Sequence, residues 1–578
     1  MSEPLSERTA TPTERTFLGH PRGLVILFLT EMWERFSFYG MRGLLIIYLT
    51  QHFLFSDQKS ALIYGTYLAL VYVMTIIGGT LADRYLGSRK AVTFGAILLV
   101  LGHFGMAFEG EGSRDLINIG GVEYQLALDG RGGDAGRELR APNGAITAYS
   151  LSADGSALEL ENPQAVGLPA RIELDETTRR IEAQPLYQNI LYLSLALIIA
   201  GVGYLKANIS TIVGALYEEG DARRDSGFTI YYMGINLGSA LASLGCGYLG
   251  IVYGWKWGFG LAGVGMLLGL IFFLAGQSWL EGRAEPPDAA RLRDRVLGPI
   301  TVEAACYLTG IAVIAVAMFF ILNPESFGGV MLPLGLLLLG YMLYYALRKC
   351  DTAERDRMLA ALYFILAQIP FWALFEQAGS SLNLFTDRLV DRELLGWSVP
   401  APIFQSINAI FIFTFAPLLA WLWIALDRRK LDPSTPVKFA FGVLLAGLGF
   451  LALVAGMRVG GADALTPVIF IFLIYWIHTM GELLVSPVGL SAVTKLAPAR
   501  VVGMTMGAWF LYGGFSNYLS GIIARSTGAE TIGGQITNIA AAKAGYAEVY
   551  TNVGYWAIGI SAGMLLISPV IKRLMRGA

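Results

Sequence analysis

The sequence predicts an all-α membrane protein with fourteen transmembrane helices and one small β-rich insertion. Of its 578 residues, 55% are hydrophobic and only 15% are charged, whereas soluble proteins carry about 25% charged residues. The mean hydropathy is +0.55. Apolar runs long enough to cross a bilayer as helices alternate with short charged or Gly/Pro-rich segments along almost the whole chain.

The apolar runs fall into groups of six, two and six. The expected spans are 23–51, 58–80, 91–109, 187–215, 227–253, 255–281, 299–321, 328–347, 358–385, 400–425, 437–457, 466–497, 503–525 and 549–571. We therefore expect an N-terminal six-helix bundle over 23–109 and 187–281, two additional transmembrane helices over 299–347, and a C-terminal six-helix bundle over 358–578.

The distribution of Lys and Arg predicts that both termini are cytoplasmic. Residues 1–22 would form a cytoplasmic segment without the features of a signal peptide. With this orientation the cytoplasmic loops hold clusters such as Arg89 and Lys90, residues 428–430 and residues 572–573, while the short loops on the other side hold few cations. This bias is what the positive-inside rule describes.

Residues 110–186 interrupt the series of spans with a polar, extracytoplasmic stretch. Apolar and polar residues alternate on either side of Gly120-Gly121 and again around Asp154-Gly155, which is typical of two hairpins. We expect a small β-rich module that serves as a lid or partner surface, or that has no role at all. An outer-face receptor or docking function is a further alternative.

The first span carries charges that its position makes costly. Glu31, Glu34, Arg35 and Arg42 lie in an otherwise apolar helix, and each charge at membrane depth costs at least ~2.5–3.5 kcal/mol. Glu31 and Arg35 are four residues apart, so they can pair on one helix face. These residues indicate a functional, water-accessible face; the alternative is a salt bridge that only holds helices together.

Three more ionisable residues lie within other apolar spans, and in the whole set the acidic side chains outnumber the basic ones. Four acids face three bases, and adding one proton balances them, which is what a proton-coupled carrier requires. The acids are Glu31, Glu34, Glu376 and Glu482, and the bases are Arg35, Arg42 and Lys206.

The separation of these charges also indicates a zwitterionic ligand. The cations Arg35, Arg42 and Lys206 could hold a carboxylate, and Glu482 could hold an ammonium. Side chains able to bond amides are Asn236, Asn408, Tyr39 and Tyr72. The alternative is that each charge pairs only with a neighbouring helix.

The sequence contains no pattern that indicates nucleic-acid binding, metal binding or catalysis. The net charge of −2 and the absence of a basic stripe argue against nucleic acid, and the three cysteines and four histidines show no metal-ligand spacing. His103 and His478 are expected to be satisfied helix-packing residues. A membrane enzyme would need a metal or nucleophile constellation, so we expect a carrier that is not an enzyme and needs no metal or cofactor.

At these charged residues the sequence resembles the proton-dependent oligopeptide transporter (POT) family of the major facilitator superfamily. The first-span signature Glu-x-x-Glu-Arg-Phe-x-Tyr-Tyr-Gly reads here from Glu31 to Gly40, with Phe38 in place of the first tyrosine. Further matching motifs follow in the expected order, and the loop over 79–90 resembles the superfamily's cytoplasmic loop signature. These motifs are Lys206 with Asn208-Ile209-Ser210, Tyr231-Tyr232 to Asn236-Leu237-Gly238-Ser239, Phe375-Glu376-Gln377 and Gly481-Glu482.

The resemblance implies the superfamily fold and proton-driven import of di- and tripeptides by alternating access between two six-helix bundles. The extra pair over 299–347 matches bacterial members, so we expect a bacterial inner-membrane location and a monomeric functional unit. A related carrier of amino acids, nitrate or peptide-like drugs is the alternative.

The resemblance also implies residue roles. Glu31, Glu34 and Arg35 would couple the proton to the peptide carboxylate, with Lys206 opposite. Glu376 would be a proton site and would form an outer gate with Arg42, and Glu482 would bind the peptide amino terminus and form an inner gate with Lys206. The remaining pocket residues would be Tyr39, Tyr72, Asn236, Asn408, Ser486 and Trp509.

Overall fold

The computed structural model describes residues 16–218 and 220–575. The predicted cytoplasmic segment 1–22 therefore lies mostly outside the described residues, of which 16–21 form the short strand pair β1 (Thr16–Phe17) and β2 (His20–Pro21).

The described chain contains fourteen helices of 20 or more residues, in agreement with the predicted 6+2+6 series. The first six are α1 (Gly23–Gln51), α2 (Asp57–Leu81), α3 (Ser88–Ala107), α5 (Pro185–Ala215), α6 (Arg224–Val252) and α7 (Trp255–Gly276). The additional pair is α8 (Val302–Leu322) and α9 (Pro324–Lys349). The last six are α10 (Thr352–Phe375), α12 (Ser406–Arg428), α13 (Thr435–Met457), α14 (Ile469–Leu496), α15 (Val502–Ser526) and α16 (Ile539–Leu574).

Twelve of these helices, with their short helical extensions, are long and apolar enough to cross a membrane within the part of the chain that the structure describes. The other two are α1, which carries the four charges, and α15. Both pack inside the helical body, α1 against α6 and α7 and α15 against α2 and α10, so their polar residues face protein.

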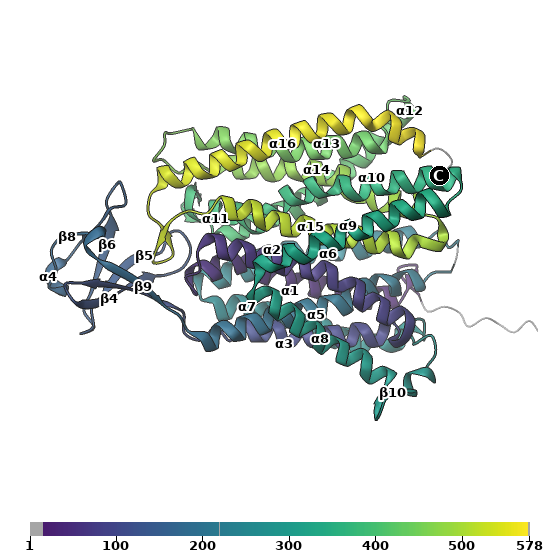
Figure 1. Cartoon of the computed structure of the whole chain (residues 1–578), viewed down its shortest axis with the longest axis horizontal. Helices are drawn as coiled ribbons and strands as arrows, with labels where there is room; N and C mark the ends of the chain where they lie inside the picture. Colours follow the sequence, from purple (N-terminus) through teal and green to yellow (C-terminus); the bar gives the residue numbers. More distant parts are fainter. Residues whose placement is uncertain (1–15, 219, 576–578) are drawn as a thin grey trace, which may run out of the picture.

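The helices form two halves that lie side by side (Figure 1). The N-terminal half, purple to blue, and the C-terminal half, green to yellow, run roughly parallel along the long axis of the molecule. They meet where α2 packs against α15, and the contact is close because a Cβ on Gly65 would lie 2.7 Å from Cα of Gly521. Small residues at such crossings let helix backbones approach one another in membrane proteins.

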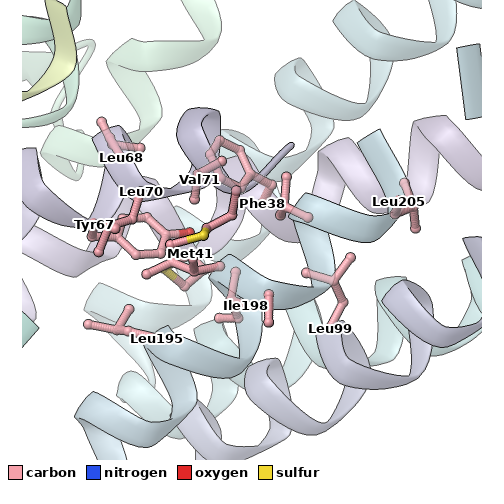
Figure 2. Packing of buried hydrophobic residues seen from close by; sticks show 14 of the residues in the cluster. Phe38, Met41, Tyr67, Leu68, Leu70, Val71, Leu99, Leu195, Ile198 and Leu205 are labelled. Atoms are coloured by element: carbon pink, nitrogen blue, oxygen red, sulfur yellow. The ribbon is translucent and has the colours of Figure 1, made fainter. Parts of the chain in front are cut away.

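The N-terminal half is held together by a dry apolar core (Figure 2). Phe38 and Met41 of α1, Tyr67 of α2, Leu99 of α3 and Ile198 of α5 are all buried in one cluster. Phe38, the departure from the family motif, is thus a core residue, 4% exposed.

Two helix boundaries differ from the prediction for physical reasons. The span expected over 358–385 is broken into α10, a 3₁₀ turn Glu376–Gly379 and α11 (Ser381–Leu389), just after Pro370, which removes one backbone donor from the last turns of α10. The last helix begins at Ile539 rather than near 549, because Asn538 caps it by accepting from the Ala541 N–H at 2.8 Å.

The predicted β-rich stretch is a seven-stranded antiparallel sheet, called the insertion module (residues 110–186) below. Its strand order is β8-β7-β6-β5-β4-β3-β9. The strands are β3 (Arg114–Ile119), β4 (Val122–Asp129), β5 (Gly136–Arg140), β6 (Ile146–Leu151), β7 (Ala157–Leu160), β8 (Arg171–Glu173) and β9 (Thr178–Glu182).

Both predicted hairpins of the module are present. Gly120 and Gly121 turn β3 into β4 with φ of 60° and 87°, backbone angles that glycine adopts without strain. The second hairpin joins β6 to β7 around Gly155. The prediction missed β5, whose sequence lacks apolar alternation. The module lies at one end of the helices, the module end, and the last turns of α16 lie at the opposite end (Figure 1).

Candidate functional site

A cavity of about 340 Å³ lies between the two halves and is lined by both. Its lining includes twelve of the thirteen residues that the sequence predicted. From the N-terminal half these are Glu31, Arg35, Tyr39, Arg42, Tyr72, Lys206 and Asn236, and from the C-terminal half Glu376, Asn408, Glu482, Ser486 and Trp509. The thirteenth, Glu34, is buried beside the cavity.

The α1 charges form a buried cluster with one guanidinium and two carboxylates. Arg35 Nε lies 3.3 Å from Glu31 Oε1, and the same guanidinium binds Glu34 with two hydrogen bonds, one of them 2.6 Å from Nη2 to Oε1. The predicted Glu31–Arg35 pair is therefore present. Since both acids share one base, this cluster carries one carboxylate more than its guanidinium can neutralise.

Phe38 contributes to the cluster through its ring. The Arg35 guanidinium carbon lies 5.1 Å from the Phe38 ring centroid, a cation–π distance. The Phe38 ring also lies 6.5 Å from that of Tyr67, nearly parallel to it. The ring also meets that of Tyr39 edge to face, with 5.5 Å between the centroids, so Phe38 acts on the cavity through Arg35 and Tyr39, which both line it.

At the module end of the cavity the two halves are joined by an ion pair between Arg42 and Glu376. Arg42 also donates to the Tyr64 hydroxyl at 2.7 Å. Glu376 occupies the break between α10 and the following 3₁₀ turn, so its side chain can reach across to α1.

Two further polar contacts continue this closure toward the module. Asn383 of α11 donates to the Gly43 carbonyl at 2.8 Å, and Arg388 pairs with Asp57 at 2.7 Å. Because α1 runs from Glu31 through Arg42 to Gln51 toward the module, these contacts shut the cavity at that end.

Lys206 and Glu482 lie in the same cavity, but no ion pair joins them among the residues described. The Lys206 ammonium lies 4.1 Å from the Tyr72 ring centroid, and Glu482 accepts from Asn408 Nδ2 at 2.8 Å. The predicted inner gate pair is therefore not formed in this conformation, and its formation in another conformation stays a prediction. Both charges are left to face whatever enters the cavity.

Sequence reasoning missed several lining residues that helical spacing could have found. Trp372 and Gln368 lie four and eight residues before Glu376 on α10, and His478 lies four before Glu482 on α14. The lining also includes Tyr232, Phe375, Gln405, Tyr475 and Asn517. These aromatic and amide groups surround the charges with surfaces that suit a peptide backbone and its side chains.

The two buried histidines differ from one another. His478 Nε2 lies 3.0 Å from the Ala446 carbonyl, which fits the predicted packing role although the ring also lines the cavity. His103 is 1% exposed and neither ring nitrogen has a partner within the described residues, so the prediction of a satisfied residue is wrong there. Within the same residues no group of three potential metal ligands occurs.

Two helical halves around a charged central cavity define a membrane transport protein. The model of the POT family matches residues 89–539. The chain therefore belongs to this family, which is a family of transporters and not of enzymes.

Three comparisons illustrate the relationship. The chain is 34% identical to the uncharacterised transporter YclF of Bacillus subtilis, over 98% of this chain and 97% of that protein. It is 30% identical to the di-/tripeptide transporter of Lactococcus lactis, over 97% and 98% of the two chains. A crystal structure of the peptide transporter POT in complex with sulfate matches with a TM-score of 0.73 and 33% identity, over 98% of each chain. The predicted superfamily fold is thereby confirmed.

Proposed function

We propose that this protein is a proton-coupled symporter that imports di- and tripeptides across the bacterial cytoplasmic membrane. The observation that carries the proposal is the division of charge within one cavity. Arg35 and Lys206 line the N-terminal side, and Glu482 lines the C-terminal side without a basic partner among the described residues. A peptide with free termini carries the complementary charges at its two ends.

The cavity can hold such a ligand from both sides. Arg35 and Lys206 would bind the carboxylate, since guanidinium and ammonium groups form strong charge-assisted hydrogen bonds with it. Glu482, oriented by Asn408, would bind the ammonium. Asn236 and Tyr39 line the space between them and would bond peptide amides.

Proton coupling follows from the acids that outnumber the bases. A proton on Glu31 or Glu34 would leave Arg35 with a single carboxylate partner, freeing part of its guanidinium for the peptide. A proton on Glu376 would weaken its pair with Arg42, because a buried ion pair persists only while both partners are charged. Release of that pair favours opening of the module end, and binding of the peptide then biases the equilibrium between the two states.

The proposal includes a topology and an assembly. The basic loops support a cytoplasmic location of both termini, and the module end would then be the outer face. Import would occur by alternating access, with the present conformation closed to the outside. Since residues of one chain form the cavity, we propose a monomer as the functional unit.

The test is uptake of labelled dialanine into liposomes that contain the purified protein. With an inward proton gradient we expect accumulation, and addition of a protonophore should abolish it. Uptake that the protonophore leaves unchanged refutes proton coupling. Competition by single amino acids, nitrate and peptide-like drugs distinguishes the alternative carriers, because nitrate offers no ammonium for Glu482.

A further inference from the structure

The insertion module is inserted in the N-terminal half of the transporter but also contacts the C-terminal half. It leaves the chain after α3 and returns at α5, both in the N-terminal half. Figure 1 shows the connection between α15 and α16, in yellow-green, extending toward the module from the C-terminal half. The module therefore spans the boundary at which the two halves meet.

The first set of contacts comes from the turn between β4 and β5. The Gly132 N–H donates to Gln51 Oε1 of α1 at 2.9 Å, and the next N–H, of Gly133, donates to Asp387 Oδ1 of α11 at 3.0 Å. Asp134 pairs with Arg392 at 2.9 Å and accepts from the Ser398 hydroxyl. One short turn thus binds both halves at once.

The glycines of this turn are required by its closeness to α11. A Cβ on Gly133 would lie 1.9 Å from the Asp387 carbonyl oxygen, and Gly132 has a φ of 79°. Only a residue without a side chain fits this approach, so the sequence is built for the contact.

The second set of contacts involves β16 (Thr531–Ile532) and β17 (Gln535–Ile536), which lie between α15 and α16. Ile532 is part of the module's own apolar core. Arg137 donates to Gln535 Oε1 and to the Ile536 carbonyl, each at 2.9 Å, and Gln535 Nε2 donates back to the Ala135 carbonyl at 2.7 Å. Asp115 accepts from the Gly533 N–H at 2.9 Å.

The stem of the module is fixed to the N-terminal half. The Ser113 N–H donates to the His52 carbonyl at 2.9 Å, and Glu109 accepts from the Lys256 N–H at 2.8 Å. If the halves separate at the module end, the module cannot follow the C-terminal half without breaking the stem contacts. The module's contacts to the C-terminal half must therefore break when the halves separate.

We propose that the insertion module is a latch that holds the two halves together at the module end, the proposed outer face. Its bonds from residues 132–137, the end of the β4–β5 turn and the start of β5, run to α11, to the loop that carries Arg392 and Ser398, and to the α15–α16 connection. These bonds hold the module end closed and break in each cycle. The latch thus favours the conformation closed to the outside. This inference rests on the proposed alternating access of the transporter.

The first experiment removes two latch side chains, Asp134→Ala and Arg137→Ala, in one variant. Spin labels at Lys59→Cys and Ala462→Cys report the opening, since both positions are exposed and belong to opposite halves, Lys59 in the first turn of α2 and Ala462 in the loop that joins α13 to α14. Cys350 is replaced by Ser, and the remaining Cys246 and Cys306 are buried. Pulsed electron paramagnetic resonance gives the distribution of distances between the two labels. We expect the fraction of molecules open at the module end to rise at least about threefold.

The matched control is Arg140→Ala, because Arg140 pairs with Glu138 inside the module at 2.8 Å. This variant should keep the distance distribution of the parent protein. An unchanged open population in the Asp134→Ala/Arg137→Ala variant, or an equal rise in both variants, overturns the latch.

The second experiment locks the latch with a disulfide between Asp134→Cys and Ser398→Cys, whose native side chains are hydrogen-bonded. Oxidation should stop dialanine uptake and a reductant should restore it, while uptake by each single cysteine variant should be the same under oxidising and reducing conditions. Uptake by the fully oxidised pair would falsify the proposal, because the module would then move with the C-terminal half. If even the parent protein fails to take up peptide, the proposed function fails, and the distance measurement still tests the latch.

Discussion

The two sides of the central cavity are built differently. Toward the module, Arg42 and Glu376 form an ion pair across the halves, and Asp57 with Arg388 forms a second. Deeper in, Lys206 rests against the Tyr72 ring and Glu482 against Asn408, with no ion pair between them in the described chain. In the proposed mechanism the paired charges keep the module end closed, whereas the unpaired charges of opposite sign bind the ligand.

The difference shows how one set of charges can serve two purposes in turn. In an alternating-access cycle the pairs at one end break as those at the other form. A ligand that satisfies Lys206 and Glu482 keeps them from pairing with each other. Substrate and gate then compete for the same charges, and a substitution on each side should have a different signature.

The largest effect is expected at the unpaired acid. Glu482→Gln keeps the Asn408 contact but removes the charge that would bind a peptide ammonium. Truncating one partner of a buried charge pair costs about 2–5 kcal/mol, so KM for dialanine should rise at least ~30-fold. Uptake of labelled peptide over a range of concentrations measures this.

An internal control comes from the ligand. Competition by N-acetyl-dialanine, which has no ammonium, should be nearly the same in the Glu482→Gln variant and the parent. Glu285→Gln, which touches only the surface pair with Arg89, should leave KM unchanged. An equal loss for both ligands would contradict the assignment of Glu482 to the amino terminus.

A smaller and different effect is expected at the paired acid. Glu376→Gln mimics the protonated carboxyl and removes the charge opposite Arg42, which keeps its contacts with the Tyr64 hydroxyl and the Tyr39 ring. Uptake driven by a proton gradient should fall by about tenfold, the effect of roughly 1.4 kcal/mol. Exchange of labelled for unlabelled peptide without a gradient should stay within about twofold, because binding itself is intact.

The ratio of gradient-driven uptake to exchange is therefore the decisive measurement for the gate. Glu376→Gln should lower this ratio, and Glu482→Gln should lower both rates at limiting peptide. If the two variants give the same ratio, the distinction between a gate pair and a ligand-binding charge is wrong.

The sequence predicted the helices and most of the cavity, because charges in apolar spans are a strong local signal. Glu31, Arg35, Tyr39 and Arg42 follow one another at spacings of four, four and three, so they share a face, and all four line the cavity. Glu34 lies one residue before Arg35, about 100° around the helix, and it faces the protein instead. The prediction grouped Glu34 with the others because it lies three residues after Glu31, and did not weigh its angle to Arg35.

What the sequence could not show depends on contacts between distant segments. The pairing of Glu376 with Arg42 joins residues 334 positions apart, and the docking of Gly133 onto Asp387 joins residues 254 positions apart. The missed strand β5 has little apolar alternation, and its place is set by β4 and β6 on either side. Packing of this kind leaves no periodic pattern in one segment.

The smallest effect is expected at Phe38, which belongs to neither side of the comparison. Phe38 lies four residues after Glu34 on the same face, away from the cavity lining, and its ring supports Arg35. Phe38→Tyr adds a hydroxyl in a buried site, and an unpaired buried hydroxyl costs about 1–3 kcal/mol. We expect the thermal unfolding midpoint to fall by a few degrees while KM changes less than about threefold. A larger change in KM, with the unfolding midpoint unmoved, would show that the hydroxyl reaches the ligand and that α1 binds peptide through a second face.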